Sequence, residues 1–305
     1  MDIARDLRSI TKDDAIESYD ELKESAIRDP DFSRIGLNAL DYFFLHHRIK
    51  AKTKRHISFY EAVKDKETIS KLNTLVVQYK KKPLASYDDV GLLKAQYQVF
   101  QLYYGTINQF RPMVARWVYK LLKPKVGILD FSAGWGGRAM AAMSMGIPYI
   151  GIDANKKLEA SYRNMIKLYE PSADVTLFFK PSEEVRFSTL QYDLIFTSPP
   201  YFMIEEYEKM PVYESKQNFL NTFFVPVIRS AWDNLRPGGN MALNMPEEMY
   251  DAIKELLPLV KRRLILPLSN RHPVNAVKRA TIGKEDKERH ELIYVWHKNA
   301  RVVCL

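Results

Sequence analysis

Residues 126–138 read VGILDFSAGWGGR and combine a short apolar run, a carboxylate and, after the carboxylate, three glycines. The apolar run, 126–130, has the length and composition of a buried strand, and the segment 140–145 beyond the glycines favours a helix. A second apolar run that ends in a carboxylate follows at residues 149–153. A strand, a helix and a strand in this order predict a βαβ unit, the building block of a parallel sheet.

Further strands are expected downstream of this unit, with helical segments between several of them. A helix should begin near Pro112, because proline is tolerated in the first turn, and should end before Pro124. We expect residues 106–305 to form an α/β domain, a doubly wound sheet of about seven strands. The five additional strands are expected at residues 175–179, 194–197, 241–244, 264–267 and 292–296.

The first third of the chain has a different pattern. Apolar residues in 1–105 recur at three- and four-residue intervals, and no alternating strand pattern is visible. We therefore expect 1–105 to form a smaller helical N-terminal domain. No internal repeat or low-complexity segment is visible in the sequence.

Composition restricts the class of protein. The chain has 305 residues with 46% hydrophobic content, enough to bury a substantial core. No stretch approaches the ~20 apolar residues of a spanning helix, and the N-terminus is too acidic and polar for a secretory signal. Cys304 is the only cysteine, which excludes an internal disulfide and a cysteine-based zinc site. We expect an intracellular protein, cytoplasmic or in the nucleoid or nucleus, without a membrane partner.

The net charge of +9 is unevenly distributed along the chain. Residues 1–45 carry 6 Lys/Arg and 11 Asp/Glu, whereas residues 46–83 carry 11 and 3 and residues 258–305 carry 11 and 4. Two basic blocks near opposite ends of the sequence could flank one cleft that binds a polyanion, although a solvated surface is the alternative. His46 and His47 have no cysteine or carboxylate at ligand spacing, so no metal site is expected.

The glycine-rich turn after residue 130 is suited to a ligand that lies against the main chain. Asp153 ends the next expected strand about 20 residues further on, where a carboxylate can accept both hydroxyls of a ribose. The glycines fall as GxGG and not as the GxGxxG of a pyrophosphate loop. A nucleoside without phosphates is therefore favoured over a dinucleotide or a bare structural turn.

These residues resemble the S-adenosylmethionine-binding motifs of class I methyltransferases. The resemblance implies a Rossmann-like methyltransferase sheet, with S-adenosylmethionine as cofactor. It implies that Asp130 lies near the methionine amino group, that Asp153 holds the ribose, and that the segment 108–112 covers the methionine end. Ser182 and Glu183 are at positions that often contact adenine, with a solvent-exposed loop as the alternative. The cofactor-binding residues implied in this way are Phe110, Arg111, Asp130, Ser132, Ala133, Gly134, Gly136, Asp153, Ser182 and Glu183.

A second motif follows the strand expected at 194–197, which stops at two prolines and is followed by an aromatic ring: Ser198-Pro199-Pro200-Tyr201. The carboxyl end of a strand in an open α/β sheet is where ligands bind. An exocyclic amino group of a base is a poor nucleophile, because its lone pair is delocalised into the ring. Hydrogen bonds from that group to the Ser198 hydroxyl and to the rigid Pro199 carbonyl would favour a pyramidal nitrogen. Tyr201 offers a face for a base removed from its stack.

This motif resembles the Ser-Pro-Pro-aromatic form of the amino-methyltransferases, and the resemblance covers roughly residues 108–298. It implies Ser198, Pro199, Pro200 and Tyr201 as catalytic residues and methylation of DNA, with cytosine N4 favoured over adenine N6. Methylation at carbon 5 needs a cysteine nucleophile, and Cys304 lies far from any motif. Target recognition would fall to 1–105 and to the basic loops at 270–272 and 278–279.

Two alternatives to a DNA amino-methyltransferase stay open. One is the same chemistry on adenine in RNA or on a protein glutamine amide, which shares the delocalised lone pair. The other is a catalytically silent partner that binds nucleic acid and keeps the fold. The carboxylate of Asp153 and the complete 198–201 motif weigh against a silent partner. The sequence does not predict the oligomeric state.

Overall fold

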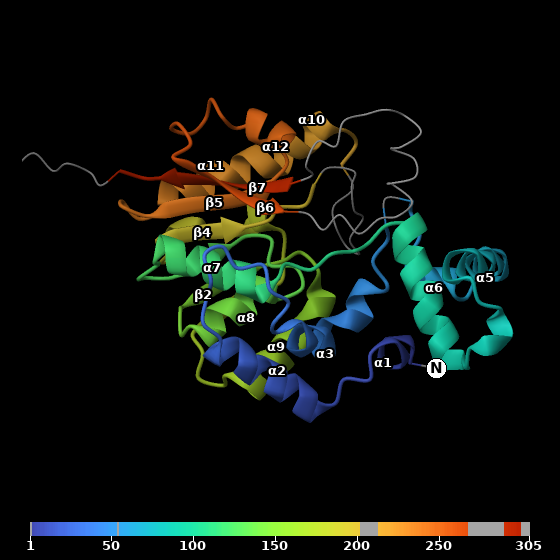
Figure 1. Ribbon diagram of the computed structural model, residues 1–305. Helices are drawn as coiled ribbons and strands as arrows, with labels where there is room; N and C mark the ends of the chain where they lie inside the picture. Colours follow the sequence, from blue (N-terminus) through green and yellow to red (C-terminus); the bar gives the residue numbers. More distant parts are fainter. Residues whose placement is uncertain (1, 54, 202–212, 268–289, 300–305) are drawn as a thin grey trace, which may run out of the picture.

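The structure is a computed structural model and describes residues 2–53, 55–201, 213–267 and 290–299. Figure 1 shows a sheet with helices on both sides and a group of helices that projects to one side. The first six α-helices are α1 (Ile3–Leu7), α2 (Lys12–Glu24), α3 (Leu37–Arg48), α4 (Phe59–Ala62), α5 (Lys66–Lys80) and α6 (Asp89–Tyr103). The others are α7 (Pro112–Leu122), α8 (Gly137–Ser144), α9 (Glu159–Tyr169), α10 (Lys216–Phe219), α11 (Val225–Asn234) and α12 (Glu247–Asp251), with a π-helical turn, η5 (Leu220–Phe224), between α10 and α11.

Seven strands form one sheet in the order β3-β2-β1-β4-β5-β7-β6. The strands are β1 (Ile128–Asp130), β2 (Tyr149–Ile152), β3 (Val175–Phe178), β4 (Leu194–Thr197), β5 (Asn240–Met245), β6 (Arg262–Pro267) and β7 (His290–His297). The first five are parallel, and β7 is antiparallel to both β5 and β6. The order reverses between β1 and β4, so the predicted doubly wound, Rossmann-like sheet of seven strands is confirmed.

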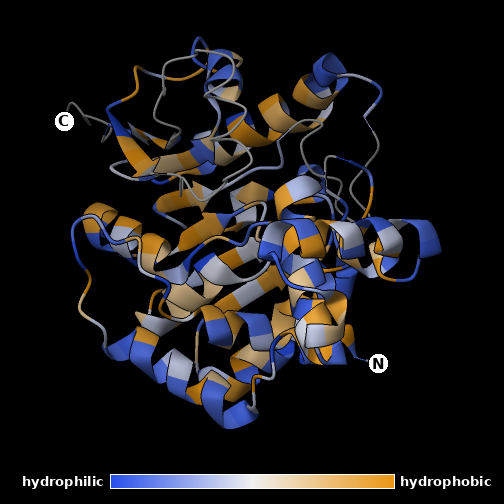
Figure 2. Cartoon of the chain, turned by 45° about the vertical axis from the view of Figure 1, so that its right-hand side comes forward, coloured by the Kyte–Doolittle hydropathy of each residue, from blue (hydrophilic) through white to orange (hydrophobic). Residues whose placement is uncertain are grey.

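Side chains of the central strands are buried on both faces of the sheet. Leu194 and Phe196 of β4 face a core shared with α7, α8 and α9, whereas Ile195 faces a second core shared with α11. Figure 2 shows the strands as mostly apolar and many of the helices as two-sided, with one polar face. Burial on both faces explains why these strands appear in the sequence as continuous apolar runs and not as alternating ones.

The N-terminal helices divide between two hydrophobic cores. Helices α2 and α3 contribute residues such as Leu22 and Phe44 to the core under α7, α8 and α9. Helices α1, α4, α5 and α6 pack together around residues such as Leu72 and Val99 in a separate cluster, to which α3 also contributes Leu45. The division at residue 105 stays a prediction, and the cores do not follow it, because α2 and α3 pack as part of the α/β layer.

Local sequence fixes the helix ends close to the sheet. Pro112 is the first residue of α7, where its missing N–H is not needed, and Lys123 ends the helix with a φ of 50° just before Pro124. Thr11 caps α2 through a reciprocal capping box with Asp14. The predicted helix from Pro112 to the residue before Pro124 is therefore confirmed.

Candidate functional site

A cavity of about 250 Å³ opens at the edge of the sheet where the parallel strands end. Residues that follow β1, β2, β3 and β4 line it, together with the last part of β5 and the first part of β7. Because β7 is antiparallel, its amino end meets the carboxyl end of β5 at this edge. The cavity lies beside the reversal point of the strand order, where open α/β sheets bind their ligands.

The glycine-rich turn brings two segments of main chain into close contact. Gly134 has a φ of 59°, a region that L side chains rarely adopt. A Cβ on Gly137 would lie only 2.1 Å from the Phe110 carbonyl oxygen. The α6–α7 link, residues 104–111, can therefore lie directly against the start of α8. Asn108, Gln109 and Phe110 of this link line the cavity.

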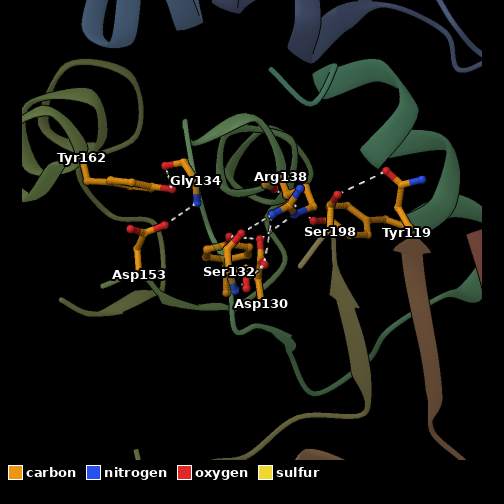
Figure 3. Close-up of polar contacts among 10 residues, drawn as sticks. Tyr119, Asp130, Ser132, Gly134, Arg138, Asp153, Tyr162 and Ser198 are labelled. Carbon is orange, nitrogen blue, oxygen red and sulfur yellow. Dashed lines mark hydrogen bonds and ion pairs between the residues drawn. The ribbon is translucent and has the colours of Figure 1, made fainter. Parts of the chain in front are cut away.

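Asp153 joins the end of β2 to the glycine turn. Its Oδ2 accepts a hydrogen bond from the Gly134 N–H at 2.8 Å, and its Oδ1 accepts one from the Asn155 N–H at 2.9 Å. Tyr162 donates its hydroxyl to the Gly134 carbonyl at 3.0 Å, which fixes the same turn from the other side (Figure 3). Burial raises the pKa of Asp153 to about 6, although both backbone hydrogen bonds act in the opposite direction. The carboxylate lines the cavity.

Asp130 lies behind the cavity wall and not in it. The side chain is fully buried, and its two oxygens accept hydrogen bonds from Arg138 at 2.6 and 3.2 Å and from the Tyr149 hydroxyl at 2.6 Å. Arg138 also donates to the Ser132 carbonyl at 2.5 Å (Figure 3), and it is among the residues that line the cavity. The residue that reaches the wall is therefore the partner of Asp130, whereas the sequence resemblance implies Asp130 itself.

The other predicted cofactor residues divide in the same way. Arg111 donates to the Phe32 carbonyl at 2.6 Å and does not line the cavity. Gly136 is also outside the wall, and a Cβ there would meet the ring of Phe44 at 2.9 Å. Ser182 does line the cavity, and its hydroxyl donates to the Phe131 carbonyl at 2.6 Å. The predicted residues that the structure brings to the wall are Phe110, Ser132, Ala133, Gly134, Asp153, Ser182 and Glu183.

All four residues of the 198–201 motif line the cavity. The Ser198 hydroxyl donates to Oδ1 of Asn244 at 3.3 Å, and the Tyr201 hydroxyl lies 3.4 Å from the Asn244 carbonyl oxygen. Asn244 is in β5, the neighbour of β4, and is almost fully buried. The motif is therefore fixed by the adjacent strand.

Several polar residues of the wall are absent from the sequence prediction, among them Arg138, Asn155, Asn244 and Glu291. Glu291 is near the start of β7, directly before Leu292, whose carbonyl accepts a hydrogen bond from the Asn244 side chain at 3.1 Å. Burial raises the pKa of Glu291. A charged residue directly before the apolar run of the last strand was a visible signal. Its position beside Ser198 depends on the β5–β7 register, which no local pattern specifies.

Other wall residues are mainly apolar or aromatic, which is the usual composition of a small-molecule site. They include Phe131, Trp135, Leu158, Pro181, Tyr213 and Phe223. Within the described ranges, no three His, Cys, Asp or Glu side chains gather as metal ligands would. None of the described helices combines the length and the apolar character that a membrane crossing needs. The basic loops at 270–272 and 278–279 and Cys304 lie outside the described residues.

No protein-family model and no curated protein matches the sequence. Among solved structures, TrmN from Thermus thermophilus matches over 61% of this chain and 48% of that chain, with 18% identity and a TM-score of 0.43. A putative RNA methyltransferase from Pyrococcus horikoshii matches over 63% of this chain and 83% of that one, with 15% identity and a TM-score of 0.41.

A third structure is the 1,6-didemethyltoxoflavin-N1-methyltransferase of Burkholderia thailandensis, with bound 1,6-didemethyltoxoflavin and S-adenosylhomocysteine. It matches over 61% of this chain and 76% of that one, with 11% identity and a TM-score of 0.40. The chain thus spans about half the length of the Thermus protein and more of the other two. Likenesses at this level leave the activity to be argued from the cavity itself.

Proposed function

We propose that this protein is an S-adenosylmethionine-dependent methyltransferase that acts on the exocyclic amino nitrogen of a base in a nucleic acid. Cytosine N4 in DNA is the favoured target, and adenine N6 is the second. The proposal depends on one observation, namely that Asp153 and the 198–201 motif line the same cavity. Such a reaction needs a carboxylate that can bind the ribose of the cofactor and a site that can hold a planar amino group.

The residues of the β1–β2 side fit the cofactor. Gly134 has no side chain on the ligand side of the turn, and Asp153 keeps lone pairs beyond its two backbone hydrogen bonds for ribose hydroxyls. Leu158 and Pro181 supply apolar contacts for the adenine ring, and the buried guanidinium of Arg138 complements the methionine carboxylate. When bound, S-adenosylmethionine supplies the methyl group on an activated sulfonium.

The β4 side fits the base. The Ser198 hydroxyl and the Pro199 carbonyl accept hydrogen bonds from the amino group of the base, so that the lone pair of its nitrogen becomes available for the transfer. Proline keeps that carbonyl in place before the substrate arrives. Tyr201 offers its ring face to the extruded base, as enzymes that act on bases require.

A basic surface beside the cavity domain suits a polyanion. The block 46–83 includes helices α4 and α5, which pack with α6 in the projecting group of helices (Figure 1). Exposed Lys64 lies 3.8 Å from the ring centre of Tyr60, and Arg55 lies 6.0 Å from that of Tyr104. Cations placed beside aromatic rings are typical of surfaces that bind nucleic-acid backbone and unstacked bases.

The direct test is incubation with methyl-labelled S-adenosylmethionine and separate duplex DNA, single-stranded DNA, RNA and protein pools, followed by digestion and product analysis. We expect N4-methylcytosine in DNA, with loss of label in Ser198→Ala and retention in Ser188→Ala, an exposed serine outside the cavity. N6-methyladenine in DNA would change the base and keep the enzyme class. Label in RNA or in glutamine would favour the corresponding alternative, and no label anywhere would leave the silent partner.

A further inference from the structure

We infer that Glu291 accepts the proton that the amino nitrogen loses on methylation, and that Asn244 positions Ser198 for this step. This inference rests on the proposed function and adds a proton acceptor to it. Neither residue belongs to the two sequence motifs. Both line the cavity beside Ser198, at the edge where β4, β5 and β7 meet.

The side-chain amide of Asn244 connects β4 to β7. Its Oδ1 accepts the Ser198 hydroxyl at 3.3 Å, and its Nδ2 donates to the Leu292 carbonyl at 3.1 Å. Glu291 directly precedes Leu292, so it lies at the same end of β7 as this amide. Because Nδ2 faces Leu292, the carbonyl oxygen of the amide faces Ser198.

This orientation determines where the Ser198 hydroxyl donates and where it accepts a hydrogen bond. Because the single hydroxyl hydrogen points at Asn244, the lone pairs of Ser198 Oγ remain available on the cavity side. A base amino group can only donate, and its nitrogen lone pair must stay free for the methyl group. Asn244 therefore makes Ser198 an acceptor before the substrate arrives, which is the polarity that the proposed reaction needs.

Among the described carboxylates of the cavity wall, Glu291 is the one on the side of the base. Asp153 and Glu183 follow β2 and β3, on the opposite side of β1 from β4, and Asp153 holds the glycine turn. Asp130 is behind the wall and is paired with Arg138. Burial raises the pKa of Glu291, which makes its carboxylate a stronger base than an exposed one.

The step balances as a simple substitution followed by proton transfer. The nitrogen lone pair forms the new N–C bond while the C–S bond breaks, and its electron pair stays on sulfur. The nitrogen then carries a positive charge and loses one of its two hydrogens as a proton. Glu291 takes that proton, which leaves a neutral methylamino group on the base, and later releases it to solvent.

The test compares Glu291→Gln with the parent in single-turnover methylation of the substrate identified above. Glutamine has nearly the size and shape of glutamate, so the cavity wall keeps its geometry while the basic group is removed. We expect the transfer rate to fall by about a hundredfold or more, in the range of general-base catalysis. The dissociation constants for S-adenosylmethionine and for the nucleic acid should stay within about twofold, as expected when an interaction acts only on the chemical step.

The matched control is Glu248→Gln, the same substitution at an exposed carboxylate that pairs with Lys216 outside the cavity. Glu291→Asp restores a carboxylate and should recover part of the transfer rate. Asn244→Ala should lower kcat with little change in KM, because the Ser198 hydroxyl loses the acceptor that orients it. Thermal melts check that each variant is folded.

Different results would contradict the role of Glu291 and the proposed function. A parent protein that methylates a base amine while Glu291→Gln retains its rate within about threefold would overturn the role of Glu291 and leave the proposed function intact. Equal loss of rate in Glu291→Gln and Glu291→Asp, both folded, would also overturn it. A parent that methylates no amino nitrogen would remove the proposed function and this inference together.

Discussion

The ionisation of Asp153 gives a quantitative test of the cofactor half of the site. Burial raises the pKa of this carboxyl from 3.8 to about 6, and only the ionised form offers acceptors to two ribose hydroxyls beyond the Gly134 and Asn155 N–H groups. At pH 8 nearly all of the free protein is ionised, whereas at pH 5 only about one tenth is. The apparent dissociation constant for S-adenosylmethionine should therefore rise about tenfold between pH 8 and pH 5.

The sign of the effect on folding is opposite. A carboxyl whose pKa is raised in the folded state binds more protons there than in the unfolded state, so its contribution to stability is greatest below pH 4 and is lost as the pH rises through about 6. Protonation of Asp153 at pH 5 therefore favours the folded state. Weaker cofactor binding at that pH would not be a consequence of unfolding caused by this group. Thermal melts at each pH provide the check.

Isothermal titration calorimetry at pH 5, 6, 7 and 8 measures the effect, and Asp153→Ala is the reference. The parent should show the tenfold change, while the variant should bind weakly at every pH with a flat profile in this range. The loss of binding free energy at pH 8 should be roughly 1.5–3 kcal/mol, the usual value of hydrogen bonds to a charged group. A parent profile as flat as that of Asp153→Ala, or equal affinity of the two at pH 8, would remove Asp153 from the cofactor site.

The remaining predictions concern the base, the link and the basic surface. Tyr201→Ala should weaken capture of the base by roughly 1–3 kcal/mol of stacking. Tyr201→Phe should retain much of the activity, because the ring face is the part that holds the base; steady-state kinetics separate the two variants. Gly137→Ala should cost about 1–3 kcal/mol in urea unfolding, because its Cβ would overlap the Phe110 carbonyl oxygen. An unchanged free energy of unfolding would contradict the close approach of the link to α8. Binding of a duplex should weaken steeply as the salt concentration rises. Replacing the lysines of 46–83 should reduce the slope of log binding constant against log salt concentration by about 0.9 for each phosphate that is no longer neutralised. An unchanged slope would identify this block as ordinary solvated surface.

The sheet was predictable because its strands are short, buried and well separated. Each of the seven expected strands overlaps an observed one, and the 194–197 strand has the predicted bounds. Burial on both faces produces continuous apolar runs, and glycine, proline or a carboxylate ends several of them. These signals are local, so one sequence was enough.

The site was most predictable in the segments that follow the strands and in the link before α7. Asp153 and Ser198 belong to the segments that follow strands, and both line the cavity. Asn244 and Glu291 meet through the antiparallel β5–β7 register, and the pairing of Asp130 with Arg138 depends on how the turn folds back. The packing of α2 and α3 against α8 and α9 could not be predicted either, because an amphipathic pattern does not specify its partner.

The α6–α7 link has a thermodynamic consequence. Its residues 108–110 form part of the cavity wall, and its other end continues into α6 of the projecting helical group. A small molecule in the cavity and a polyanion bound to those helices would therefore contact opposite ends of the α6–α7 link. Any change that cofactor binding makes in the affinity for nucleic acid must be matched, by the same factor, in the affinity for cofactor when nucleic acid is bound.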